Sequence, residues 1–317
     1  MKKSLAYIAR LVVTIGLLVV LVKHINVKEV LAIVKNVNSG WFIVALGVGV
    51  GGLVVNAMRW REILKASKVE IPIMTVLRCN LVGVFYGIIL PGGKVTGDTI
   101  SAYRLIKDTG GKDDIKKYII SIVADRFVGV FAILSVIFSF FIINHPSTLL
   151  FKEQKDIVGI GLALLIVGGL SLMFVTRIAM VELKIKKNSL QWVNNIITKI
   201  NLVFVLVGRE KSKIFRAIIF GVTGVLAATI SVFMLANALG IQQTFGVIGF
   251  SYLLATALII VPITIAGIGL REGGMIYFLT QLGVNTTEAA ALSILVLVVF
   301  FGFAILGGLI EMKRIIL

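Results

Sequence analysis

Long runs of apolar residues are the feature that most limits how this chain can fold. Each run approaches the roughly 20 residues that an α-helix needs to cross a bilayer. The runs lie at 5–22, 41–58, 118–143, 157–175, 214–238 and 288–312. With 58% hydrophobic and 15% charged residues, the composition excludes a soluble globular domain. The runs are also longer than the short alternating strands of a β-barrel. We therefore predict an all-α polytopic membrane protein with about six full spans, its residues 1–317 forming one integral membrane domain.

Two further stretches, 76–107 and 246–284, combine apolar residues with proline and glycine. Proline removes a backbone donor and clashes with the preceding turn, and glycine weakens a helix. Non-helical backbone at membrane depth is tolerated only where protein buries it or where it lines a wet cavity. We predict two re-entrant or broken helical hairpins whose breaks face each other and form the functional site. The residues expected at the breaks are Pro91, Gly92, Gly93, Gly97, Pro262, Gly267 and Gly269.

The distribution of Lys and Arg predicts the orientation. If the N-terminus is cytoplasmic and each hairpin enters and leaves on one side, most basic residues fall in the cytoplasm. The outside then receives Lys23, Lys28, Lys35, Lys152 and Lys155. The positive-inside rule favours this arrangement, with both termini cytoplasmic in the plasma membrane of a prokaryote. Topology and attraction to anionic lipids account for the net charge of +17 without a nucleic-acid partner.

An internal repeat follows from the spacing of the breaks. Pro91 and Pro262 lie 171 positions apart, and the same shift places two spans of the first half on spans of the second. Because matched spans run in opposite directions, the pattern is typical of an inverted-topology repeat. We predict halves at 1–145 and 157–317. A cytoplasmic insert at 184–208 has helical amphipathic spacing, and either lies in the membrane interface or packs on the end of the bundle.

Several charged residues are candidates for a site. Asp125 and Arg126 lie inside a predicted span, where charges are costly and either pair or face a cavity. A structural ion pair with Arg104 or Arg271 is one interpretation. Arg59, at the end of its span, is interpreted as an interfacial anchor.

The first-turn carboxylates have a similar pair of interpretations. Asp98 fits an N-cap of a helix at 99–107, and Glu272 fits the first turn of a helix at 272–282. In the functional alternative, basic side chains and free helix amides converge on a phosphate, and carboxylates hold the arginines. This predicts a substrate-binding headgroup cleft formed by Arg104, Arg126, Arg271, Asp98, Asp125 and Glu272.

The sequence offers little for other chemistry. With one cysteine and two histidines, neither a metal site nor a catalytic triad is expected. The glycine pairs match neither a Walker nor a dinucleotide fingerprint, so we expect no cofactor.

Short motifs carry a resemblance to a known family over nearly the whole chain. They are Arg59-Trp60, Leu90-Pro91-Gly92-Gly93, Gly97-Asp98 with Arg104, Asp125-Arg126, Gly267-Ile268-Gly269 and Arg271-Glu272. In these the chain resembles the flippase-like family, also called the lysylphosphatidylglycerol synthase transmembrane region. The resemblance implies a bundle with re-entrant hairpins that works on lipid headgroups. In fused members, this region moves aminoacylated phosphatidylglycerol, and a soluble C-terminal domain transfers lysine from its tRNA.

The end of the chain at Leu317 leaves no room for that transferase, so we expect no aminoacyl transfer by this chain alone. The main hypothesis is a lipid translocase for an anionic or aminoacylated phospholipid or a polyprenyl-phosphate lipid, driven by a gradient or by downhill flux. One alternative is the membrane component of a phosphatidylglycerol lysyltransferase, with a separate soluble transferase as partner. Another is a membrane scaffold for lipid or glycan enzymes.

Overall fold

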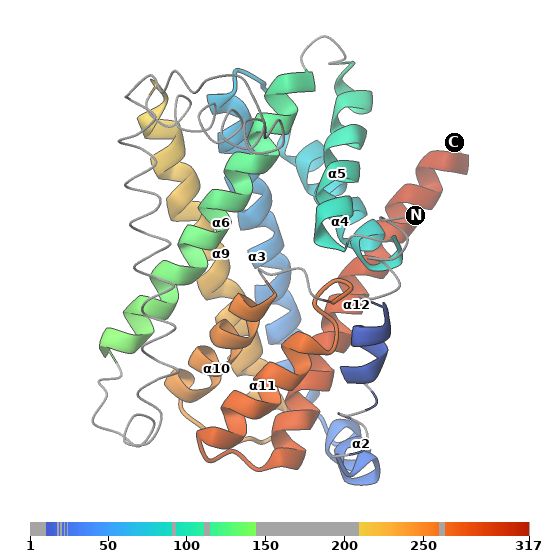
Figure 1. Ribbon diagram of the computed structural model, residues 1–317, viewed down its shortest axis with the longest axis vertical. Coiled ribbons are helices and arrows are strands. Elements are labelled where there is room, and N and C mark those ends of the chain that lie inside the picture. Colours follow the sequence, from blue (N-terminus) through green and yellow to red (C-terminus); the bar gives the residue numbers. More distant parts are fainter. Residues whose placement is uncertain are drawn as a thin grey trace, which may run out of the picture.

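A computed structural model of the chain describes residues 11–90, apart from 18, 20, 22 and 24, and residues 93–110, 115–143, 209–259 and 264–316. Every regular element in this described part is a helix (Figure 1). The long helices are α3 (Ser39–Ala66), α6 (Ile115–Ile143), α9 (Lys211–Ala238) and α12 (Thr286–Ile316). The shorter ones include α2 (Val27–Lys35), α4 (Ile73–Ile89), α5 (Lys94–Thr109), α10 (Phe245–Leu258) and α11 (Leu270–Gln281).

The four long helices correspond to four of the predicted spans. Stretches long and apolar enough to cross a membrane lie at 39–66, 117–140, 211–238 and 286–314. The predictions at 41–58, 118–143, 214–238 and 288–312 are thus confirmed as long apolar helices. The predicted span at 5–22 lies partly outside the described residues, and 157–175 and 184–208 lie wholly outside them.

The helix breaks also lie where the sequence predicts them. In the first broken pair, α4 ends at Ile89 and α5 begins at Lys94. Gly93, just before α5, has a φ of +57°, a left-handed conformation that costs glycine little. In the second pair, Gly267 and Gly269 have φ values of +80° and +83° between α10 and α11. Pro91, Gly92 and Pro262 lie outside the described residues.

Close packing holds the two members of each broken pair together. A Cβ added to Gly97 of α5 would collide with the backbone carbonyl of Gly83 in α4. A Cβ added to Gly274 of α11 would lie 2.7 Å from Cδ1 of Leu258 in α10. Each pair is therefore a hairpin of two short helices in contact, and the first pair depends on glycine at its crossing.

The long helices α3 and α9 pack antiparallel along their lengths. At one end, the amide of Asn38 donates to the carbonyl of Ala238 at 2.8 Å. At the other end, Nζ of Lys213 donates to the carbonyl of Lys65 at 3.2 Å. Helix α6 packs beside both, and α12 runs with its C-terminal end close to the α4–α5 pair (Figure 1).

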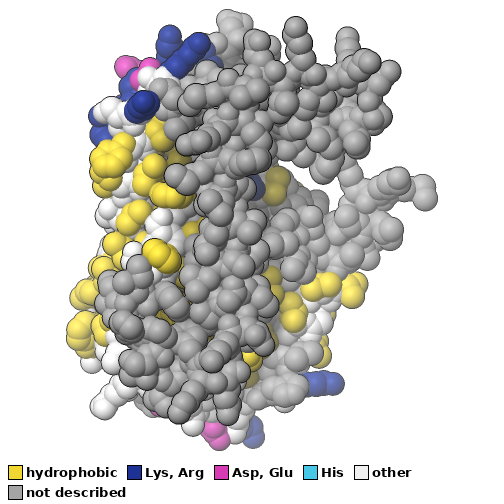
Figure 2. Space-filling view, turned by 60° about the vertical axis from the view of Figure 1, so that its left-hand side comes forward, with side chains coloured by type: hydrophobic (Ala, Val, Ile, Leu, Met, Phe, Trp, Pro, Cys, Tyr) yellow, Lys and Arg dark blue, Asp and Glu magenta, His cyan; other side chains and the backbone are white. Residues whose placement is uncertain are grey.

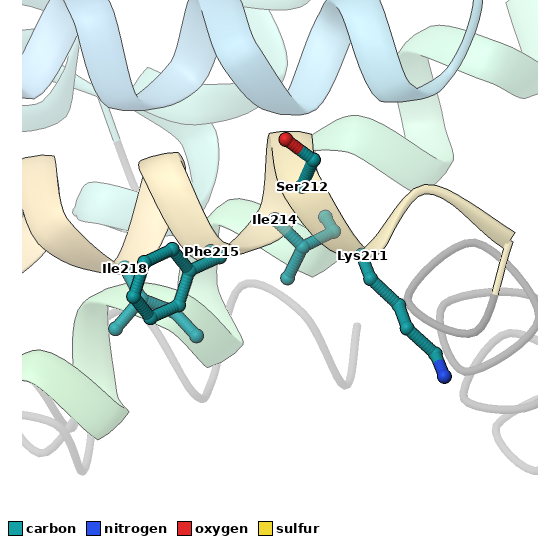
Figure 3. Close-up of a pocket in the computed structure, with 5 residues that line it drawn as sticks. All are labelled: Lys211, Ser212, Ile214, Phe215 and Ile218. Atoms are coloured by element: carbon teal, nitrogen blue, oxygen red, sulfur yellow. The ribbon is translucent and has the colours of Figure 1, made fainter.

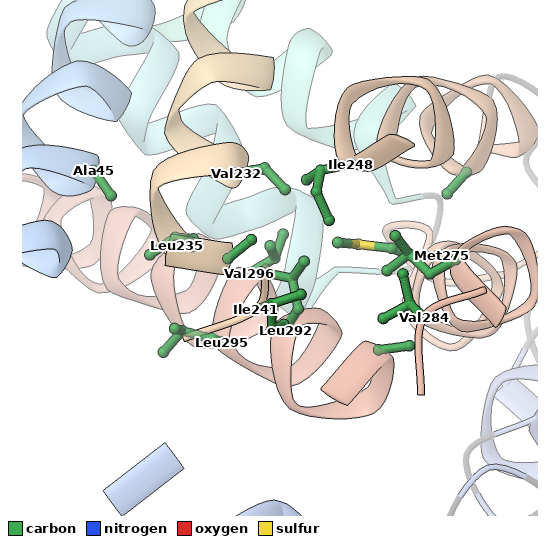
Figure 4. Close-up of a cluster of buried hydrophobic side chains, with 14 residues drawn as sticks. Ala45, Val232, Leu235, Ile241, Ile248, Met275, Val284, Leu292, Leu295 and Val296 are labelled. Atoms are coloured by element: carbon green, nitrogen blue, oxygen red, sulfur yellow. The ribbon is translucent and has the colours of Figure 1, made fainter. Parts of the chain in front are cut away.

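A large apolar core joins α3, α9, α10, α11 and α12 (Figure 4). Its members include Ala45, Val232, Ile248, Met275 and Leu292, each at most 4% exposed. This core fixes the α10–α11 pair against one end of the long helices. The α4–α5 pair lies at the other end, as Figure 1 shows.

Basic side chains are more numerous at one end of the bundle than at the other. One end, which we call the basic end, carries Arg61, Lys65, Lys117, Lys211, Lys213, Lys313 and Arg314. Figure 2 shows Lys and Arg gathered there, with hydrophobic side chains over the surface below. Exposed apolar side chains such as Ile43, Phe215 and Val298 lie on the long helices, as expected for helices that face lipid.

Candidate functional site

The two helix breaks meet inside the molecule. A Cβ added to Gly93, in the first break, would lie 2.9 Å from the backbone nitrogen of Ala266, in the second. Ala266 itself has a φ of +55°, which is rare for a residue other than glycine. The prediction that the breaks face each other is therefore confirmed for these residues.

Residues near the N-terminus pack over the second break. Oγ1 of Thr14 accepts a hydrogen bond from the amide of Ile265 at 3.0 Å. A Cβ added to Gly269 would lie 3.1 Å from Cβ of Leu17. Sequence reasoning missed this role of Thr14, whose only signal is a polar residue in an apolar run.

Beside the second break, Glu272 has two partners. One carboxylate oxygen accepts from the amide of Gly269 at 2.7 Å, which caps the start of α11. The other accepts from Nε and Nη2 of Arg271, at 3.0 and 2.8 Å. The guanidinium of Arg271 lies over the ring of Phe300, 5.0 Å from its centre. The predicted first-turn position of Glu272 is confirmed, and its charge is compensated by its neighbour.

Near the first break, Asp98 pairs with Arg126 of α6 at 2.7 Å. Helix α5 begins at Lys94 after Gly93, so Asp98 lies in its second turn and the predicted N-cap is wrong. The side chains of Arg126 and Asp98 keep 37% and 30% of their surface exposed.

Asp125 forms a different pair, with Arg59 of α3. Its two carboxylate oxygens accept from Nε and Nη2 of Arg59, both at 2.8 Å. Nη1 of Arg59 also donates to Oδ1 of Asn56 at 3.1 Å. The predicted partners of Asp125, Arg104 and Arg271, are wrong. So is the interfacial role of Arg59, because α3 packs against α6 and buries its guanidinium.

Arg104 pairs with a residue that the sequence analysis did not single out, Glu311 of α12. The hydroxyl of Tyr86 in α4 donates to the same carboxylate oxygen at 3.1 Å. Glu311 lies next to Lys313 and Arg314, and in sequence it is indistinguishable from a charge at the membrane surface.

A small cavity lies beside Asp98 and Asp125, the acidic members of the pairs with Arg126 and Arg59. Its volume is about 20 Å³, and it is lined by Trp60, Asn80, Asp98, Ser101, Ile122 and Asp125. Such a volume admits a water molecule but not a lipid headgroup. In the described part of the chain, no three His, Cys, Asp or Glu side chains are close enough to hold a metal ion.

A larger depression, of about 460 Å³, lies on α9 (Figure 3). Apart from Lys211 and Ser212 its lining is apolar: Ile214, Phe215 and Ile218. Residues 144–208, which precede α9, lie outside the described residues, so we assign no site to this surface.

Of the predicted site residues, the structure brings together Asp98 with Arg126 and Arg271 with Glu272. It places Arg104 and Asp125 in pairs with residues outside the prediction, Glu311 and Arg59. The arrangement therefore pairs the charged side chains beside the two helix breaks, with Arg271–Glu272 buried and Asp98–Arg126 partly exposed.

Comparison with known proteins agrees with this architecture. A family model described as the lysylphosphatidylglycerol synthase TM region matches residues 7–308. A UPF0104 membrane protein of Pyrococcus horikoshii is 18% identical over 328 residues, covering 96% of each chain. No solved structure matches the chain. Because the family model spans nearly the whole sequence, this multi-pass membrane protein belongs to the lysylphosphatidylglycerol synthase TM region family.

Proposed function

We propose that the protein is a lipid translocase that moves the headgroup of an anionic or aminoacylated phospholipid, or of a polyprenyl-phosphate lipid, across the membrane. The observation that carries the proposal is the contact between the two helix breaks at Gly93 and Ala266. Broken helices that meet inside a bundle are a common way to build a binding site at membrane depth. Irregular backbone and buried charge there are costly, and function is the usual reason for them.

The ion pairs beside the breaks supply chemistry for a phosphate group. A guanidinium binds carboxylate and phosphate with the same planar fork of donors. In the structure, Asp98 neutralises Arg126 and Glu272 neutralises Arg271. An anionic headgroup that enters between the hairpins would exchange with these carboxylates. The amides at the starts of α5 and α11 would add further donors.

The repeated order of the helices supports an inverted-repeat transporter. A long helix, two short helices and a long helix occur twice, as α3 to α6 and as α9 to α12. The first members of each set, α3 and α9, are antiparallel. In this proposal the halves at 1–145 and 157–317 are related by an axis in the membrane plane.

The charge of the basic end supports its assignment to the cytoplasm of a prokaryotic cell, by the positive-inside rule. The hairpin α4–α5 would then enter from the cytoplasm and α10–α11 from outside. A substrate path would run between them, with the acyl or polyprenyl chains left in the bilayer. The proposal requires neither a nucleotide nor a metal.

Transport by the purified protein tests the proposal. Full-length protein in liposomes is compared with empty liposomes for transbilayer movement of fluorescent phosphatidylglycerol, lysylphosphatidylglycerol and a polyprenyl phosphate. We expect faster movement of at least one lipid. Arg271→Gln should reduce the rate of this movement at least about tenfold, because the headgroup phosphate would lose a charge-assisted hydrogen bond.

Arg61→Gln is the matched control. Arg61 lies at the basic end of α3 and donates to the carbonyl of Ile71, away from both breaks, so this variant should keep wild-type transport. Wild-type rates equal to those of empty liposomes for all three lipids would overturn the proposal.

The name of the family favours a second candidate, the membrane component of lysylphosphatidylglycerol synthesis. That role would need a separate soluble transferase. Cells that express such a transferase with and without this chain should then differ in lysyl-lipid content. Lysyl-lipid content that does not change when this chain is added would exclude this candidate.

A further inference from the structure

We propose that Glu311 is a proton-binding site, and that its ionised form closes a latch between α5 and α12. The latch consists of two ion pairs, Arg104–Glu311 and Asp108–Arg314. A proton on Glu311 would open the latch and release α5 from α12. The proposal that Glu311 binds a proton holds whether or not the protein transports lipid. A role for this proton in driving transport rests on the proposed function.

The charges of the latch are crossed between the two helices. Helix α5 contributes the basic residue Arg104 and the acidic residue Asp108. They are four residues apart, which places them on one helix face. Helix α12 contributes the acid Glu311 and the base Arg314, three residues apart. The basic residue of each helix pairs with the acid of the other, so the cluster has no net charge and joins α5 to α12 at two points.

Glu311 differs from the other buried glutamates in the described residues. Its side chain is 3% exposed, and Oε1 accepts from Tyr86 and pairs with Arg104. Its Oε2 is buried without a partner, as is Nε of Arg104. By contrast, both carboxylate oxygens of Glu62 and of Glu272 accept hydrogen bonds.

The ionised form of Glu311 is costly in free energy, because its carboxylate is buried and one of its oxygens has no hydrogen-bond partner. A proton on Glu311 removes the charge, and with it the attraction to Arg104. The latch then keeps only Asp108–Arg314. Since α5 begins at the helix break near Gly93, movement of α5 away from α12 would also separate the break from Ala266.

The groups that surround Glu311 come from three helices. Besides Arg104 and Tyr86, the Asp108–Arg314 pair lies one turn along each helix, and Cys79 of α4 lies beside Asp108. Helices α2, α9 and α11 pack against an earlier part of α12, around residues 289–300. Protonation of Glu311 is therefore set chiefly by Arg104, Tyr86 and the second pair.

Cys79 is a natural reporter for the latch. It is the single cysteine of the chain, it is fully buried, and its Sγ lies 3.9 Å from Oδ2 of Asp108. While the latch is closed, N-ethylmaleimide should react with it slowly. Movement of α5 away from α12 should draw Asp108 from the thiol, expose it and raise the rate. Intact-protein mass spectrometry measures this rate on the full-length protein in nanodiscs.

Glu311→Gln mimics the protonated form. At about pH 7.5 we expect it to raise the labelling rate of Cys79 at least about tenfold, because loss of one partner of a buried pair strongly favours opening. Arg104→Gln breaks the same pair from α5 and should give a similar rise. The matched control is Glu62→Gln, which removes a buried carboxylate paired with Lys65 and Arg216 and should leave the rate unchanged.

Whether protonation of Glu311 opens the latch is tested by a ratio of Cys79 labelling rates. The rate of Glu311→Gln is divided by the wild-type rate measured at the same pH. This ratio cancels the effect of pH on the thiol itself. As the pH is lowered, this ratio should fall toward one once the wild-type protein protonates Glu311.

Two results would overturn the proposal. Wild-type labelling rates in both Glu311→Gln and Arg104→Gln would exclude a latch. A raised ratio that stays constant with pH would exclude Glu311 as the proton site. Neither result depends on whether the protein moves lipid.

Discussion

At the scale of single residues, adjacent charges in α6 have different surroundings. Both oxygens of Asp125 are used by Arg59, which is held in turn by Asn56. Arg126 has a single ion-pair bond to Asp98, and both side chains stay about one-third exposed. Because neighbours on a helix project about 100° apart, one residue faces α3 and the other faces α5. We infer that the first pair stabilises the fold and the second can exchange partners.

This difference predicts opposite effects of two similar substitutions. Asp125→Asn takes from the buried guanidinium of Arg59 the carboxylate that it is hydrogen-bonded to, and should lower the free energy of unfolding by about 3–5 kcal/mol. Asp98→Asn removes a partly exposed pair and should cost about 1 kcal/mol or less. Unfolding in mixed detergent micelles measures both.

The control is the double variant Arg59→Met with Asp125→Leu, which removes the buried charges together and should recover most of the stability. Equal losses for Asp125→Asn and Asp98→Asn would contradict the distinction.

At this scale the sequence could predict that the charges pair, but not which residues pair. The free-energy cost of a charge inside a membrane span is enough to predict that it needs a partner. The choice of Arg59 for Asp125 depends on the packing of α3 against α6, and the two residues are 66 positions apart. Glu311 and Thr14 were missed for the same reason, because their roles exist only in the packed bundle.

At the scale of elements, local chemistry made the helix breaks predictable. Glycine and proline act through their own backbone, so no knowledge of packing is needed to place a break. The start of α5 was less predictable: the helix begins at Lys94, because Gly93 adopts a positive φ and makes the turn before it. The close crossing of α4 and α5 at Gly83 and Gly97 also depends on packing.

Substitution of glycine tests this crossing. Gly97→Ala would drive a Cβ into the carbonyl of Gly83 and should destabilise the protein by about 1–3 kcal/mol, as overpacking does. Gly47→Ala is the control, because a Cβ at Gly47 in α3 meets nothing within 4 Å. That variant should be neutral or up to about 1 kcal/mol more stable, since alanine favours a helix. A thermal or detergent unfolding series that ranks Gly97→Ala as stable as Gly47→Ala would show that α4 and α5 do not cross so closely.

At the scale of the whole molecule, two sets of four helices share one order. Helices α3, α4, α5 and α6 match α9, α10, α11 and α12 in their pattern of long and short. An inverted repeat would place the two hairpins at opposite ends of the long helices, and the hairpins lie there and meet at their breaks (Figure 1). Hydropathy and spacing were sufficient to predict the order of long and short helices, because that order depends on segment lengths and not on particular contacts.

The repeat predicts that equivalent loops face opposite sides of the membrane. Glu70, between α3 and α4, and Gln242, between α9 and α10, are both exposed and occupy matching positions in the two sets. In a Cys79→Ser background, a membrane-impermeant maleimide added to intact cells should label Gln242→Cys. It should label Glu70→Cys only after the cells are permeabilised, because the basic end faces the cytoplasm under the positive-inside rule.

Two exposed positions serve as controls for this assignment: Lys107→Cys on α5 should behave like Glu70→Cys, and Asn285→Cys before α12 should behave like Gln242→Cys. Labelling of Glu70→Cys and Gln242→Cys from the same side would exclude the inverted repeat. The reverse pattern would keep the repeat and invert the proposed orientation.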